Sequence, residues 1–94
     1  MEHLKTELWE PILDTEEDID AFLDAAFEDG DPKVIASAIG WVARKRGMTD
    51  VARSAGLGRE SLYKALSADG HPQLDTVAKV LAALGYRLSV TRAA

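Results

Sequence analysis

The chain has 94 residues, of which 47% are hydrophobic and 29% charged, and its net charge is −5; these values predict one small globular domain. It has no cysteine and only two histidines, which excludes a disulfide scaffold, a cysteine nucleophile and a Cys/His zinc site. The longest charge-free apolar run, residues 34–43, is about half of a membrane span, and no signal-peptide pattern opens the chain. We therefore expect a soluble, cytoplasmic protein without a membrane partner.

The negative charge is confined to one part of the chain. Residues 1–32 carry twelve acidic side chains and one lysine, a net charge of −11, whereas residues 33–94 carry ten basic and four acidic side chains, a net charge of +6. The total alone argues against a nucleic-acid partner, because phosphate repels a negative protein. The division instead predicts two surfaces with two partners, the alternative being an uneven distribution that arose by chance.

An arm and a helix are predicted in the first third of the chain. Residues 1–14 show no clear period and are expected to form a partly extended N-terminal arm, outside the core, ahead of a domain at residues 15–94. Thr15, with Asp18 three residues later, is typical of a helix cap. Apolar residues then recur at helical spacing as far as Gly30, which is expected to end this helix.

A second helix is predicted to begin at Asp31 and Pro32, which suit the cap and the first helical position. It is expected to end at Gly47, after a cationic run that suits the negative end of the helix dipole. Gly40 inside this helix should cost about 1 kcal/mol relative to alanine, which indicates a close contact with another helix.

Three further helices and a strand are predicted in the remaining chain. A short helix covers residues 49–55 with Thr49 as its cap, another covers about 59–67, and an amphipathic helix covers 74–84. Apolar and polar residues alternate over 86–91, which predicts a strand. The expected fold is all-α, with five helices and a short C-terminal β-strand. Because a lone strand leaves backbone groups unpaired, we expect it to pair across a homodimer through Tyr86, Leu88 and Val90.

The stretch from residue 48 to 66 has the internal spacing of a helix-turn-helix, which we place at about residues 49–67. Ala52 is small enough to let the two helices approach, and Gly56, four positions on, suits the turn. In the second helix Leu62 and Leu66 are expected to face inward, which leaves a polar outer face suited to base edges. The alternative is an ordinary solvated face with Glu60 and Lys64 as a helical ion pair.

Groove chemistry suggests a role for each outward residue. Arg59 can donate two hydrogen bonds to guanine, and Glu60 can accept a hydrogen bond from the amino group of cytosine. Lys64 can reach either guanine or a phosphate. Tyr63 can contact a thymine methyl group or a phosphate. Backbone phosphates, which fix register and affinity but carry no sequence information, are expected to contact a second set of residues: Thr49, Arg53, Arg44, Lys45 and Arg46.

From about residue 13 to residue 90 the sequence resembles the addiction-module antidote proteins, the HigA-like helix-turn-helix antitoxins. The resemblance rests on the runs LDTEEDIDAFLDAAFEDGDP, ARKRGM and GLGRESLYKALSADGHPQLDTVAKVLAALGYRLSV. It implies a Cro/repressor-like fold, a homodimer, and an antitoxin that binds a RelE/HigB-like ribonuclease toxin and represses the shared operon at its operator DNA. The family's base-reading positions fall on Arg59, Glu60, Ser61, Tyr63 and Lys64.

The acidic part of the chain then acquires a predicted role. The resemblance implies a basic toxin, so an acidic segment with apolar anchors is suited to cover it. The expected toxin-binding residues are Trp9, Ile12, Leu13, Glu16, Glu17 and Asp20. The alternative is that the acidic residues of the first helix form a solvated face and that its apolar residues only contribute to the core.

Other classes of function find little support in the sequence. The serines lack a nucleophile-elbow context, no phosphate-binding glycine loop is present, and the acidic run lacks the ligand spacing of a calcium loop, so we expect neither an enzyme nor a cofactor or metal. The alternative within binding functions is a free-standing phage-type transcriptional repressor without a toxin partner.

Overall fold

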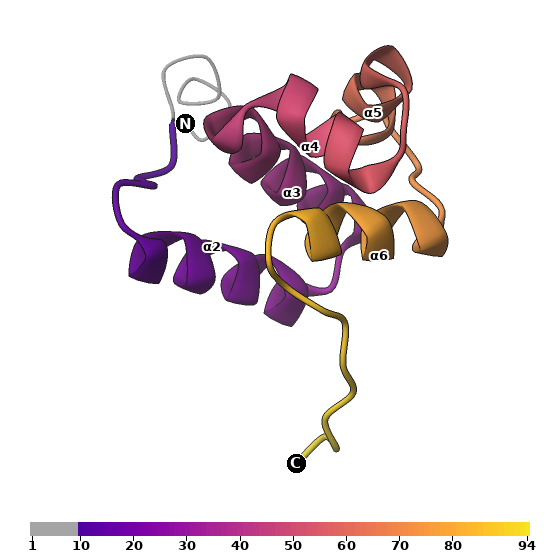
Figure 1. The fold of residues 1–94 in the computed structure, drawn as a ribbon. Helices are drawn as coiled ribbons and strands as arrows, with labels where there is room; N and C mark the ends of the chain where they lie inside the picture. The colour runs from indigo at the N-terminus through magenta and orange to yellow at the C-terminus, as the bar shows by residue number, and fades with distance from the viewer. Residues whose placement is uncertain (1–9) are drawn as a thin grey trace.

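The computed structural model describes residues 10–94, most of which are helical (Figure 1). Five helices lie in this range: α2 (Glu16–Asp29), α3 (Pro32–Arg46), α4 (Met48–Ala55), α5 (Arg59–Ala65) and α6 (Leu74–Ala83). The all-helical part of the predicted fold is thus confirmed for the described residues. None of these helices combines the length and apolar character that crossing a membrane requires.

The first two helices begin where the sequence predicts. Thr15 Oγ1 accepts a hydrogen bond from the amide of Asp18 at 3.0 Å, and Asp18 Oδ2 accepts one from the amide of Thr15 at 3.1 Å. This reciprocal pair is a capping box, which satisfies amides that have no partner inside the helix. At α3, Asp31 Oδ1 accepts from the amide of Lys33 at 2.9 Å, and Pro32 occupies the first helical position.

Two predicted helix boundaries are wrong by a residue or two. Thr49 is not the cap of α4, because the amide of Val51 already donates to the Gly47 carbonyl at 3.0 Å and the helix starts at Met48. Helix α5 ends at Ala65 rather than Ser67. The Ser67 hydroxyl donates to the Lys64 carbonyl at 2.9 Å, and such a local bond offers the backbone an alternative to a further helical turn.

The helices pack in a chain of neighbours around one apolar core. Helix α2 lies against α3, α3 against α4, and α4 against both α5 and α6. No polar or charged side chain is buried within residues 10–94, so removal of apolar surface from water is the main force that holds the helices together. The largest fully buried side chains are Ile39, Val42, Leu62, Leu66 and Val80.

Gly40 marks the close helix contact that its position inside α3 predicts. A Cβ atom added there would lie 2.5 Å from the backbone oxygen of Leu66 and 3.3 Å from its Cβ atom. Leu66 follows directly after α5. The absence of a side chain at residue 40 therefore allows the C-terminal end of α5 to rest on the backbone of α3.

The predicted C-terminal strand is wrong for this structure: residues 86–94 form an irregular tail that projects from the helical body (Figure 1). The amide of Tyr86 donates to the Leu81 carbonyl at 2.7 Å, and beyond it the described residues form no backbone–backbone hydrogen bond. Alternating side chains favour extended backbone, but a strand also needs a second edge, and the described helices provide none. Leu88 and Val90 are exposed as a result.

The expectation that the arm lies outside the core is wrong for Leu13. Its side chain is only 5% exposed and packs in the same cluster as residues of α2, α3 and α4. Its neighbour Ile12 is 74% exposed. The described part of the arm is therefore anchored in the core by Leu13.

Candidate functional site

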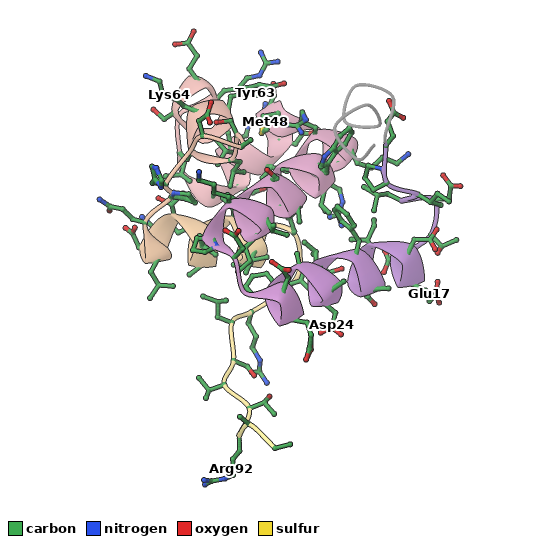
Figure 2. All side chains as sticks on the ribbon, turned by 180° about the vertical axis from the view of Figure 1, so that it is seen from behind. Glu17, Asp24, Met48, Tyr63, Lys64 and Arg92 are labelled. Carbon is green, nitrogen blue, oxygen red and sulfur yellow. The ribbon has the colours of Figure 1, made fainter. Side chains whose placement is uncertain are left out.

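Helix α5 presents the residues that the sequence assigns to base reading. Its inner side is held by Leu62 and by Leu66 just beyond its end, both fully buried. In Figure 2 the side chains of Tyr63 and Lys64 project from the top of the molecule, away from the helical body. All five predicted residues lie in this one short helix and are exposed: Arg59, Glu60, Ser61, Tyr63 and Lys64.

On this outer surface Arg59 and Tyr63 contact each other, whereas Glu60 and Lys64 do not form an ion pair. The Arg59 guanidinium carbon lies 5.4 Å from the centre of the Tyr63 ring, a cation–π arrangement that places the arginine over the ring face. Within the described residues Glu60 and Lys64 form no ion pair, contrary to the alternative of an i, i+4 pair. Together with Ser61 and Tyr63 they line a shallow hollow.

The turn before α5 sets the angle at which that helix leaves the body. Gly56 adopts a left-handed conformation with φ of 71°, which side chains with a Cβ atom rarely adopt. The amide of Leu57 donates to the carbonyl of Ala52 at 2.9 Å, and Ala52 itself is buried. The first amides of α5 have no side-chain cap, because Gly58 precedes the helix. The connection between α4 and α5 consists of three residues, 56–58.

The residues predicted to hold phosphates are all exposed, on α3 and α4, and two of them already have partners within the protein. Arg53 is paired with Asp50 at 3.0 Å, with both side chains largely exposed, so a phosphate would compete with a carboxylate there. The Arg44 guanidinium lies 5.2 Å from the centre of the Trp41 ring. Arg44 and Lys45 also line a hollow with the arm residues Glu10, Pro11, Leu13 and Asp14. Thr49 is exposed in the first turn of α4.

The predicted toxin-binding residues have different environments. Glu16, Glu17 and Asp20 are exposed on α2, and in Figure 2 Glu17 and Asp24 lie on the lower side of the molecule, opposite Tyr63 and Lys64. Ile12 is exposed as well, whereas Leu13 is buried and already contributes to the core. Trp9 lies outside the described residues.

One feature of the acidic side could not be anticipated from the sequence. The Tyr86 hydroxyl donates a hydrogen bond to Asp20 Oδ1 at 2.5 Å, which joins the root of the tail to α2 across 66 residues. Burial of the phenol, reinforced by the bond to Asp20 and the nearby negative charges of Asp20 and Glu16, raises the pKa of Tyr86 to about 12, while Arg46 opposes the shift. No local pattern signals a contact between residues so far apart.

Comparison with known proteins identifies the family. Residues 7–92 match the model of a family described as "Probable addiction module antidote protein". The chain therefore belongs to the addiction-module antidote family, and the resemblance seen in the sequence is confirmed. An antidote acts on a toxin, so membership also gives the general class of partner.

A relative from Haemophilus influenzae is 44% identical over 78 residues, which covers 83% of this chain and 80% of the relative. That relative carries the name "Uncharacterized protein" and so adds no activity. No solved structure matches the chain.

Proposed function

We propose that the chain is an antitoxin that neutralises a basic RelE/HigB-like ribonuclease toxin by direct binding and represses its own operon as a DNA-bound homodimer. In this proposal α4 and α5 form a helix-turn-helix of the Cro/repressor type, and α5 enters the major groove. The acidic side of α2, together with the arm, binds the toxin.

The observation that carries the proposal is the separation of the two surfaces. The base-reading candidates lie on α5 at one side of the molecule, and the acidic residues of α2 lie at the opposite side (Figure 2). A negative surface is unfavourable beside DNA phosphates but favourable beside a basic protein. The short connection between α4 and α5, with Gly56 in the left-handed region, also fits a helix-turn-helix.

Replacement of Arg59 by alanine tests the DNA part. Binding to the DNA upstream of the gene should weaken by about 1–3 kcal/mol, and discrimination should relax at one base pair of each half-site. The measurement is fluorescence anisotropy with a set of single-base operator variants. Lys79→Ala on α6 removes the same charge outside α5 and is the control. An equal loss on all DNA sequences would contradict base reading by Arg59.

The expected dimer sets the geometry of the operator. Two copies of α5 should contact half-sites about 34 Å apart, one helical turn of DNA. Tight binding of a monomer to an isolated half-site would contradict the dimer.

Removal of the arm tests the toxin part. Because Leu13 is buried in the core, the deletion should stop at residue 11, so that the fold is retained. Growth rescue is measured in cells that express the proposed toxin, to be sought as a small basic protein encoded in the neighbouring reading frame. We expect the truncated chain to rescue less well than the full chain. Full rescue would contradict a role for the arm, and the absence of any complex with the full chain would favour the free-standing repressor.

A further inference from the structure

A groove runs between α2 and the C-terminal tail, on the side of the molecule away from α5. Its floor is apolar, and consists of Leu23 and Phe27 of α2 and Leu81 of α6. One wall consists of α2 carboxylates that recur every four residues, at Asp20, Asp24 and Glu28. The opposite wall is the tail, which contributes residues 86–89 and 91.

The hydrogen bond from Tyr86 to Asp20 holds the two walls together at one end of the groove. Tyr86 also packs against the core and donates its amide to Leu81, so the root of the tail is fixed by both its backbone and its side chain. Further along, Leu88 is 39% exposed and lines the groove beside Ser89 and Thr91. The groove is thus bounded on both sides, and its lining includes one exposed apolar residue, Leu88.

The charges of the groove specify the chemistry of its occupant. Three carboxylates on the α2 wall face a single cation, Arg87, on the tail wall. Neither Asp24 nor Glu28 forms an ion pair within the described residues. Such a groove attracts a segment that combines cationic side chains with an apolar side chain for the floor.

We infer that this groove binds a basic, partly apolar segment of the toxin, so that contact extends along α2 through Asp24 and Glu28 to Leu88. The inference rests on the proposed function, since it names the surface on which that toxin lies. It differs from the arm and first-turn contacts, because the residues that carry it lie in the second half of α2 and in the tail. Tyr86 acts as a positioning residue that holds the tail wall in place.

The test uses calorimetry to compare how purified variants bind the proposed toxin, sought as a small basic protein encoded in the neighbouring reading frame. Asp24→Asn with Glu28→Gln removes two exposed carboxylates, each worth about 1.5-fold to 5-fold in affinity, so we expect about tenfold weaker binding and a smaller salt dependence. Leu88→Ala leaves the charge unchanged and should weaken binding about fivefold. The matched control, Asp69→Asn with Asp75→Asn, removes the same charge outside the groove and should bind like the unmodified chain.

Circular dichroism and sedimentation of each variant separate the remaining outcomes. The exposed positions of Asp24 and Glu28 allow both substitutions without loss of the fold. If the groove variants bind the toxin as tightly as the control, the inference about the groove is overturned while the proposed function stands. If the unmodified chain does not bind that protein, both the inference and the proposed function are wrong. If the groove variants instead change a dimer into a monomer, the occupant is a second copy of the chain, which also overturns the inference.

Discussion

Replacement of Gly40 by alanine is expected to destabilise the fold, although alanine is the better helix former. The substitution gains about 1 kcal/mol in helix propensity. Against this, the new Cβ atom would lie 2.5 Å from the backbone oxygen of Leu66, a separation that requires one helix to move. Overpacking of a core costs about 1–3 kcal/mol, and a backbone neighbour places this case at the upper end. The expected net loss is about 1–2 kcal/mol.

Urea and thermal unfolding followed by circular dichroism measure this loss. For a chain of this length the melting temperature should fall by about 5–15 °C. Gly58→Ala is the matched control, because a Cβ atom there meets only the Ser61 hydroxyl at 3.8 Å. Its expected cost is below about 1 kcal/mol, the difference between glycine and alanine as a helix cap.

A double substitution tests whether the Leu66 side chain beyond Cβ takes part in the clash. Leu66→Ala removes that part of the side chain but leaves the carbonyl oxygen and the Cβ atom in place, so the clash caused by Gly40→Ala should remain. If Gly40→Ala is as stable as the unmodified chain or more stable, the close approach of α3 and Leu66 does not constrain the fold. A large favourable coupling with Leu66→Ala would instead assign the clash to the Leu66 side chain beyond Cβ.

Two further predictions concern contacts in the N-terminal half of α2. Tyr86→Phe should lower the free energy of unfolding by about 1 kcal/mol at neutral pH, as the bond to Asp20 is lost. Because the folded-state pKa of Tyr86 is about 12 and the unfolded value 10.0, the unmodified chain should keep full stability below pH 10 and lose stability towards pH 12. Urea titrations across this range should show a shallower fall for the variant, and equal slopes would contradict the assignment. Thr15→Ala should cost about 1 kcal/mol through loss of the capping box, whereas Thr15→Ser should retain most of the stability; an unchanged urea midpoint for Thr15→Ala would count against the cap.

The first two helices were predictable because their starts depend on neighbouring residues. Thr15 caps α2 through Asp18 and Asp31 caps α3 through Lys33, while Pro32 occupies the first position of α3, so the signal and the structure lie within a few residues of each other. The α5 surface was predictable for the same reason, since Leu62 and Leu66 face inward at helical spacing and the polar residues between them face outward.

The parts that could not be predicted depend on distant residues. The alternation after Tyr86 is a real local pattern, but strand formation needs a second edge that the described residues do not supply. Burial of Leu13 depends on how the arm packs against the folded core, and one apolar residue without a period carries no such information. The bond from Tyr86 to Asp20 likewise appears only once the fold has brought the two residues together.

The placement of α2 and α5 on opposite sides of the molecule has a consequence for regulation. Under the proposed function, a toxin on α2 and an operator on α5 need not exclude each other, so the geometry predicts a ternary complex in which the chain binds both at the same time. Without coupling through α3 and α4, the two binding free energies should simply add. The toxin would then leave the affinity of the chain for DNA unchanged and increase the size of the complex on the DNA. Neutralised toxin would accordingly remain bound at the promoter of the shared operon.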